Sequence, residues 1–238
     1  MNRQHSLLNR NDVHVWFRQT RSISDAEEQM ANRYLSSEEC KRRDRLVFQL
    51  DRRDYSVSHD LLRRKLSIHG AISPADWTFQ TNPWGKPSLA GKSSLSFSLS
   101  HTRGFVACAI GITAAIGVDV ETIRQNISYL DLAKQYFAKS EVESLRSCSP
   151  EEGPVLFTEL WTLKEAYLKA KGVGISGGLD SITFECNQGK VTPHKFSKSD
   201  PGATWMSMFS PVDGMRMAIA SLCVEPPRIS VYEDYGDS

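Results

Sequence analysis

The sequence predicts a mixed α/β (α+β) protein, and three observations support this prediction. Residues 116–121 (IGVDVE) alternate apolar and polar side chains with the period of two that is typical of a half-buried strand. Residues 157–171 (FTELWTLKEAYLKAK) are rich in strong helix formers and are followed by Gly172, the residue type that commonly ends a helix. The length of 238 residues allows one large domain or two halves of about 120 residues, and either can bury a core.

The composition is that of an ordinary globular protein. Hydrophobic residues make up 40%, charged residues 24% and aromatic residues 9% of the chain, which excludes disordered and fibrous classes. The formal net charge of +1 excludes a strong overall field, so a charged partner would have to meet a local patch.

Membrane and secretory functions are not expected. No run of about 18 apolar residues is present, and the first twenty residues lack the apolar stretch of a secretory signal. The five cysteines are scattered without a CxxC pair, which argues against a disulfide framework or a zinc site. We therefore expect a cytoplasmic protein.

The chain is predicted to open with a strand at residues 12–17 (DVHVWF) and a helix at 24–35. Two serines followed by two glutamates at 36–39 indicate the start of the next helix. Over residues 33–65 the pattern is mostly helical, and ten basic residues stand against six acidic ones. Such a surface can meet phosphates, but it can equally be a solvated, salt-bridged helix face.

A stiff turn is predicted at residues 82–89 (NPWGKPSL), after a short strand at 77–79. The two prolines and the glycine of this turn oppose regular structure and fix the backbone around Lys86. A lysine held in this way can direct its ammonium at a phosphate, although surface turns often carry lysines without any such role.

Residues 95–111 predict a strand pair with a tight turn at 101–104. The second strand is almost wholly apolar, as expected for a strand buried on both faces. His101 lies at the end of the first strand, where functional side chains often project. It could equally be a turn residue bonded to backbone.

Within residues 116–121, alternation directs Asp119 and Glu121 to the same face, with α-carbons about 6.6 Å apart. Two carboxylates held this close repel each other unless a positive charge lies between them. A hard dication such as Mg²⁺ prefers oxygen ligands and would supply that charge. The alternative is a solvent-facing acidic edge.

On the helix at 157–171, Trp161, Glu165 and Lys169 recur every fourth residue and share one face. The simplest reading is an amphipathic helix with a Glu165–Lys169 ion pair worth a few tenths of a kcal/mol. Trp161 is expected to pack and fix the helix.

The remaining segments complete the prediction. Short helices are expected at 129–137 and 141–146, and a loop at 172–178 (GVGISGG), which follows a helix instead of starting one. Closing antiparallel strands are expected at 181–185, 203–210 and 215–224. The acidic tail after Pro227 is expected to be loose.

Four motifs in this order resemble a known family. They are residues 84–87 (WGKP), 97–102 (FSLSHT), 116–121 (IGVDVE) and 160–169 (LWTLKEAYLK), with weaker matches at 51–63 and 38–42. The chain resembles the 4′-phosphopantetheinyl transferases, in the long, Sfp-type class related to the surfactin-synthetase activator. Thr102 stands where the family usually has serine. A basic residue that some members carry just before the GKP turn is absent at 80–81.

The resemblance implies the 4′-phosphopantetheinyl transferase fold, with two pseudo-symmetric halves that each contain a small, mostly antiparallel sheet and helices. Residues 1–112 would grip coenzyme A, residues 113–238 would supply the metal site and the catalytic helix, and the active site would lie in the cleft between them. A short relative works as a trimer, so the doubled chain is expected to be a monomer.

The resemblance also implies a reaction. The protein would transfer 4′-phosphopantetheine from coenzyme A to a serine of an apo acyl, peptidyl or aryl carrier protein and release adenosine 3′,5′-bisphosphate. The metal would be Mg²⁺, with Mn²⁺ as a substitute. Whether the carrier serves fatty-acid, polyketide or nonribosomal-peptide synthesis stays open. The carrier would meet a basic or apolar surface near the cleft.

The site residues follow from the same resemblance. Asp119, Glu121 and Glu165 would bind the metal, and the catalytic set would be Asp119, Glu165 and Lys169. Glu165, or a metal-bound water that it orients, would take the proton of the carrier serine, and Lys169 would hold the diphosphate. Coenzyme A would be bound by Arg42, Lys86, Pro87, Ser100, His101, Asp119 and Lys169.

Two other functions stay open at this point. A coenzyme A or nucleotide sensor would keep the binding residues without turnover, but the presence of all three carboxylates disfavours it. A nucleic-acid-binding module built on residues 42–65 would show steeply salt-dependent binding. It leaves the carboxylates unexplained, so no nucleic-acid partner is expected.

Overall fold

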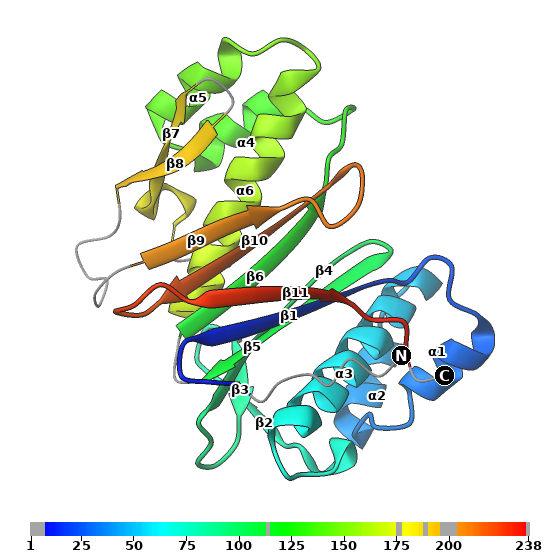
Figure 1. Cartoon of the computed structure of the whole chain (residues 1–238). Coiled ribbons are helices and arrows are strands. Elements are labelled where there is room, and N and C mark those ends of the chain that lie inside the picture. Colours follow the sequence, from blue (N-terminus) through cyan, green and yellow to red (C-terminus); the bar gives the residue numbers. More distant parts are fainter. Residues whose placement is uncertain (1–7, 113–114, 175–177, 188–189, 196–203, 237–238) are drawn as a thin grey trace.

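The computed structural model of the chain describes residues 8–112, 115–174, 178–187, 190–195 and 204–236. These residues form six α-helices and eleven strands, which are arranged in two larger sheets and two hairpins (Figure 1). The predicted mixed α/β class with small, mainly antiparallel sheets is confirmed.

The first sheet has four strands in the order β11-β1-β5-β4. They are β1 (Asp12–Gln19), β4 (Leu95–Thr102), β5 (Phe105–Ile112) and β11 (Arg228–Glu233). The pairs β1–β5 and β4–β5 are antiparallel, whereas β11 runs parallel to β1. Three helices pack together on one side of this sheet (Figure 1): α1 (Asp25–Ala31), α2 (Ser37–Asp44) and α3 (Gln49–His69).

The second sheet has three antiparallel strands in the order β6-β10-β9. They are β6 (Ala115–Thr122), β9 (Thr204–Phe209) and β10 (Met215–Leu222). The set β1, β4, β5 and the set β6, β9, β10 both lie in the order first–third–second, which supports the predicted similarity of the two halves.

Further helices and two hairpins complete the fold. The helices are α4 (Tyr129–Tyr136), α5 (Lys139–Arg146) and α6 (Glu152–Lys171), with short 3₁₀ turns η1 (Pro74–Asp76) and η3 (Leu179–Ser181). The hairpins pair β2 (Phe79–Thr81) with β3 (Pro87–Leu89), and β7 (Thr183–Asn187) with β8 (Lys190–Lys195).

Alternation along β5 shows how the layers stack. Val106 and Ile110 belong to a core that also contains Leu61 of α3. Ala107 points to the opposite face and belongs to a core that contains Val118 of β6. The two sheets therefore pack face to face, with α3 outside the first sheet and α6 outside the second.

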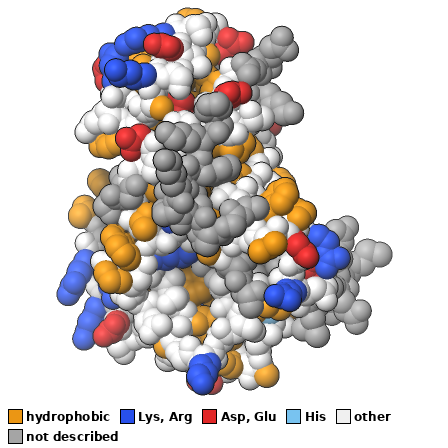
Figure 2. Space-filling model, turned by 90° about the vertical axis from the view of Figure 1, so that its left-hand side faces the viewer, with side chains coloured by type: hydrophobic (Ala, Val, Ile, Leu, Met, Phe, Trp, Pro, Cys, Tyr) orange, Lys and Arg blue, Asp and Glu red, His pale blue; other side chains and the backbone are white. Residues whose placement is uncertain are grey.

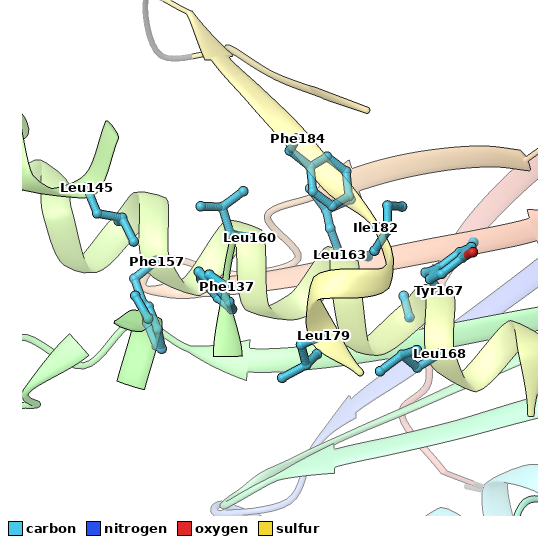
Figure 3. Close-up of a cluster of buried hydrophobic side chains, with 14 of the residues drawn as sticks. Phe137, Leu145, Phe157, Leu160, Leu163, Tyr167, Leu168, Leu179, Ile182 and Phe184 are labelled. Carbon is cyan, nitrogen blue, oxygen red and sulfur yellow. The ribbon is translucent and has the colours of Figure 1, made fainter. Parts of the chain in front are cut away.

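The core between α6 and the second sheet is built largely by the helix itself (Figure 3). Leu160, Leu163 and Tyr167 of α6 are buried there beside Phe137 and Phe184. Full burial of such a side chain contributes about 1.5–3 kcal/mol, so this core fixes the helix that carries the candidate catalytic residues. Trp161 packs partly buried against it, as the sequence predicts.

The predicted ends of two helices are confirmed. The Ser36 hydroxyl accepts a hydrogen bond from the Glu39 amide, and the Glu39 carboxylate accepts one from the Ser36 amide, so a capping box starts α2. Helix α6 is followed by Gly172 with a φ of 72°, in the left-handed region that favours glycine.

Three details differ from the sequence prediction. The predicted strand at 77–79 begins only at Phe79. Pro87, in the turn predicted to be irregular, starts strand β3, where a missing N–H is tolerated. The tail predicted to be loose forms β11 and pairs with β1, which makes that prediction wrong. Part of the predicted loop at 172–178 lies outside the described residues.

Strand β11 also bears on the predicted domain boundary. It comes from the second half of the sequence but joins the sheet of the first half. The division at residues 112 and 113 therefore does not follow the sheets at the end of the chain, and it stays a prediction.

The face of the molecule in Figure 2 carries no dominant charge among its described residues. Figure 2 shows basic, acidic and apolar side chains interspersed on one face, in keeping with the net charge of +1. Among the described residues, no helix combines the length and the apolar composition that a membrane crossing needs.

Candidate active site

Strand β6 and helix α6 touch at Gly117, and this contact places the acidic face of β6 under the helix. A β-carbon built on Gly117 would lie 1.9 Å from the Ala166 carbonyl oxygen and 2.5 Å from the Ala170 amide nitrogen. Only glycine allows this approach. Because side chains alternate along a strand, Asp119 and Glu121 face the helix as Gly117 does.

Asp119 is buried and is held by donors from two other elements. The Lys169 ammonium of α6 lies 2.6 Å from its Oδ1, and the Ser100 hydroxyl of β4 donates to the same oxygen at 2.8 Å. Lys169 also donates to Ser100 at 2.9 Å. The second oxygen, Asp119 Oδ2, is buried and receives no hydrogen bond from the described residues.

Two further carboxyls lie near Asp119. Burial raises the pKa of Glu121 to about 7, and the charge of Asp119 adds to the shift. Burial also raises the pKa of Glu165 of α6 to about 7, again with a contribution from Asp119. Glu165 Oε1 is buried without a hydrogen-bond partner among the described residues. The helix therefore presents Lys169 to Asp119, in place of the simple Glu165–Lys169 pair that the sequence alone suggested.

The WGKP turn docks on the end of α6. The Lys86 ammonium donates to the Ile116 carbonyl at 3.1 Å and to the Ala170 carbonyl at 3.4 Å. Asn82 donates from its side chain to the Gly172 carbonyl at 2.7 Å. The last carbonyls of a helix lack partners within it, so these donors satisfy them. Burial lowers the pKa of Lys86 to about 8.

Asn82 also shapes the turn itself. Its side-chain oxygen accepts hydrogen bonds from the amides of Trp84, at 3.0 Å, and Lys86, at 2.9 Å. Asparagine favours such local contacts with its own turn. The sequence prediction did not single out Asn82, although an asparagine that opens a Pro- and Gly-rich turn is the signal by which it could be found.

Two adjoining cavities extend from α2 to α6. The first, of about 570 Å³, is lined by Arg42 and Pro87 among others. The second, of about 250 Å³, is lined by Lys86, Pro87, Glu165 and Lys169. Pro87, Phe97 and Leu99 line both cavities, so the two are neighbours across these three side chains.

His101 is the last of the predicted coenzyme contacts. It lies near the end of β4, next to Ser100. Its side chain is exposed and lines neither of the two cavities. Partial desolvation and the positive charge of Lys169 lower its pKa below the ordinary value, which favours the neutral ring. The structure therefore brings Ser100, Asp119 and Lys169 into direct contact and places Lys86 and Pro87 along the same cavity, with Arg42 farther along at α2.

Comparison with known proteins supports the family resemblance seen in the sequence motifs. The model of the 4′-phosphopantetheinyl transferase superfamily matches residues 115–220. The chain is 36% identical over 197 residues to the 4′-phosphopantetheinyl transferase HetI of Nostoc sp. (strain PCC 7120), covering 82% of this chain and 80% of that protein. The chain belongs to the 4′-phosphopantetheinyl transferase superfamily.

Two further proteins illustrate the similarity, one over most of the chain and one over less than half of it. Sfp of Bacillus subtilis (strain 168) is 27% identical over 84% of this chain and 88% of its own. Among solved structures, a holo-(acyl-carrier-protein) synthase from Bacillus anthracis in complex with CoA (3′,5′-ADP) covers 45% of this chain and 93% of its own, at 19% identity and a TM-score of 0.38.

The transferase has one group of contacts that the sequence prediction only partly identified. Ser98 accepts a hydrogen bond from the Val118 amide at 3.0 Å, and Thr102 donates to Glu121 Oε2 at 3.4 Å. The alternating serines of residues 96–100 were visible in the sequence, but only Ser100 was assigned a role. Which strand these hydroxyls meet depends on how the two sheets pack.

Proposed function

We propose that the protein transfers the 4′-phosphopantetheine group of coenzyme A to a serine of an apo carrier protein and releases adenosine 3′,5′-bisphosphate. The observation that supports this most is the pair of adjoining cavities, which leads from Arg42 past Pro87 to Lys169 and Glu165. A long ligand with phosphates along its length fits cationic side chains placed at both ends of such a path.

In this proposal the coenzyme lies along both cavities. Arg42 contacts its phosphates, Lys86 adds charge from the stiff turn, and the Pro87 backbone borders the adenine. His101, which lines neither cavity, would contact a phosphate that extends to the end of β4. Lys169 holds the diphosphate, because its ammonium lies at the end of the second cavity beside Asp119. Ser100 contributes its hydroxyl at the same point.

Mg²⁺, or Mn²⁺ in its place, is proposed to be held by Asp119, Glu121 and Glu165. Two buried carboxylate oxygens, Asp119 Oδ2 and Glu165 Oε1, accept no hydrogen bond from the described residues. Burial raises the pKa values of Glu121 and Glu165, and the charge of Asp119 raises them further; a dication would offset both effects. Bound there, Mg²⁺ would neutralise charge on the diphosphate.

The proposed metal set requires side-chain movement. In the part of the chain that the structure describes, no three His, Cys, Asp or Glu side chains are arranged so that they could hold a metal ion. Glu121 or Glu165 would have to rotate toward Asp119. Oxygen donors of this kind suit Mg²⁺, which is commonly held by one or two carboxylates together with substrate phosphates.

Glu165 is proposed to accept the proton of the carrier serine. Burial raises the pKa of Glu165 to about 7 in the metal-free protein, and a bound dication would lower it again, so the base is Glu165 itself or a metal-bound water that it orients. The carrier would approach beside Glu121, where a third cavity of about 200 Å³ is lined by Arg124 and by the apolar side chains of Ile127, Leu132 and Trp161. Such a surface suits an acidic domain with apolar contacts.

The test is to incubate the protein with coenzyme A, Mg²⁺ and a panel of apo carriers and to measure the intact mass of each carrier. A gain of one phosphopantetheine on a serine is expected. Coenzyme A binding without any gain of mass would favour the sensor instead.

A matched pair of variants tests the site. Glu165→Gln is expected to lower the transfer rate about a hundredfold to ten-thousandfold, the usual contribution of a general base. Glu152→Gln, at the exposed first residue of the same helix, removes a carboxylate that lines none of the three cavities and should keep its activity. Full activity in Glu165→Gln would refute the proposed base.

A further inference from the structure

Three hydroxyl side chains of β4 reach from the first sheet to β6 of the second. Ser98 accepts a hydrogen bond from the Val118 amide at 3.0 Å, and Ser100 accepts one from the Val120 amide at 3.2 Å. Thr102 donates to Glu121 Oε2 at 3.4 Å. Because residues two apart in a strand point to the same face, Ser98, Ser100 and Thr102 form one row. All three are buried.

This row takes the place of backbone pairing. Strand β4 is the last strand of the first sheet, and β6 is the last strand of the second, and neither pairs with the other through backbone bonds. Along β6, alternate amides point toward β10 and away from it. The Val118 and Val120 amides point away from β10 and donate to Ser98 and Ser100 of β4. These hydrogen bonds satisfy buried donors, which would cost free energy if they were left unpaired.

The residues on each side of the row belong to different parts of the site. His101 lies on β4 between Ser100 and Thr102, on the opposite face of the strand from the row. Lys86 and Pro87 lie where the preceding turn leads into β3. Asp119 and Glu121 lie on β6, and the Asp119 carboxylate itself accepts a bond from Ser100. A shift of β4 along β6 would therefore move the coenzyme-binding residues relative to the acidic residues.

We propose that the row Ser98–Ser100–Thr102 is a positioning device that fixes Asp119 and Glu121 of β6 relative to the coenzyme-binding residues. Ser98 lines the second cavity, but its hydroxyl bonds to the β6 backbone, and we assign it as a positioning residue. The proposal deepens the proposed transfer reaction and rests on it for its consequence in catalysis. The hydrogen bonds on which it depends join protein groups only, so they can be tested without substrate or metal.

Ser98→Ala tests the device, because Ser98 bonds to the β6 backbone and to neither Asp119 nor Lys169. Since Ser98 also lines the second cavity, KM for coenzyme A distinguishes positioning from direct contact. Ser56→Ala is the matched control. Ser56 is equally buried, and its hydroxyl donates to Asn32 at 2.7 Å inside the helical layer, away from β6 and from the cavities. Each variant deletes one buried hydroxyl with its hydrogen bond, so the two should lose similar stability.

The first measurement is amide hydrogen exchange on the protein without ligands. The Val118 amide should be protected in the wild type although β6 is an edge strand. Its protection should fall at least tenfold in Ser98→Ala relative to the β10 amides, and it should stay unchanged relative to them in Ser56→Ala. Equal protection of Val118 in wild type and Ser98→Ala would overturn the proposal, whatever reaction the protein performs.

The second measurement is carrier modification at varied coenzyme A. Ser98→Ala should lower kcat at least tenfold with KM for coenzyme A within twofold, and Ser98→Thr, which restores a hydroxyl, should regain most of the activity. A rise in KM alone would show that Ser98 contacts the coenzyme and would contradict the positioning role. An equal loss of kcat in Ser56→Ala would also contradict it. A wild type that modifies no carrier would refute the proposed function, while the exchange result would still stand.

Discussion

Lys86 is a half-buried cation whose ammonium is satisfied by carbonyl groups. It donates to the carbonyls of Ile116 and Ala170, and its pKa is lowered to about 8 because burial disfavours the charged form. The predicted role in binding coenzyme A requires the charged form. The same burial that places Lys86 on the cavity therefore limits the pH range in which it can bind a phosphate.

The consequence is a pH dependence of coenzyme use. As the pH rises through about 8, Lys86 loses its proton in the free enzyme, so kcat/KM for coenzyme A should fall on the alkaline side. Lys86→Arg should shift this fall to higher pH, since arginine stays charged. The measurement is kcat/KM from pH 6 to about 10, with exposed Lys92→Arg as the control. An identical alkaline limb in wild type and Lys86→Arg would show that another group titrates.

At the scale of elements, the site depends on the contact between β6 and α6. Gly117 lets the strand approach the helix backbone, and the buried pair of Lys164 with Glu141, at 3.0 Å, ties the middle of α6 to α5. Lys164 also donates to the Leu179 carbonyl at 2.8 Å. Together these contacts fix the helix turn that carries Glu165.

A methyl group at Gly117 should separate the two elements. The β-carbon of Gly117→Ala would meet backbone atoms, which cannot rotate away, so the helix must shift. We expect a loss of about 1–3 kcal/mol in the free energy of unfolding, as for other overpacked sites, and a larger proportional loss of carrier modification. Both are measured by urea unfolding and by intact mass.

Gly111→Ala in β5 is the comparison for this prediction. Its β-carbon would lie 3.3 Å from the Asp12 carbonyl oxygen, a contact that a small shift relieves. It should retain most of its stability and activity. If Gly117→Ala were as active as Gly111→Ala, close approach of β6 and α6 would not matter for the site.

The C-terminal segment of the chain packs against elements of the first half of the sequence. Strand β11 pairs with β1, and the buried Asp234 that follows it lies 2.8 Å from Arg64 and 2.6 Å from Lys65 of α3. Hydrogen bonds and charge from Arg64 and Lys65 outweigh burial and hold the pKa of Asp234 well below its usual range. Residues far apart in sequence are joined here.

Asp234→Asn should therefore destabilise the protein by about 3 kcal/mol at pH 7, since it removes the carboxylate that faces buried Lys65 and one of the two that neutralise Arg64, which keeps Asp60 at 2.7 Å. The folded pKa of Asp234 lies below the unfolded value of 3.8, so its contribution is present above about pH 4 and is lost as the pH falls further. The difference between wild type and variant, measured by urea unfolding, should be smaller at pH 3 than at pH 7. Glu233→Gln, at the exposed neighbour, should show neither effect.

The parts that local sequence determines were the parts that could be predicted. The capping box at Ser36, the end of α6 at Gly172 and the shared face of Asp119 and Glu121 follow from residues a few positions apart. Strand β11 could not be found in this way. Its partner β1 and the cations Arg64 and Lys65, which neutralise Asp234, lie in the first third of the chain, far from β11 in sequence.

The residues of the candidate site could be predicted from the sequence, but the contact between its two sheets could not. Resemblance pointed to Asp119, Glu165 and Lys169, and the structure brings Lys169 onto Asp119. The contact of Ser98 with the Val118 amide depends on how two separate sheets meet, and no pattern within one strand specifies that.

Asp119, Glu121 and Glu165 are proposed to bind one divalent ion together beside the coenzyme diphosphate. The direct measurement is Mn²⁺ binding, followed by electron paramagnetic resonance with coenzyme A present, in the wild type and in Asp119→Asn, Glu165→Gln and the exposed control Glu152→Gln. One tightly bound Mn²⁺ is expected in the wild type and in Glu152→Gln, with binding weakened at least tenfold in Asp119→Asn and Glu165→Gln. Wild-type affinity in Asp119→Asn would contradict the claim.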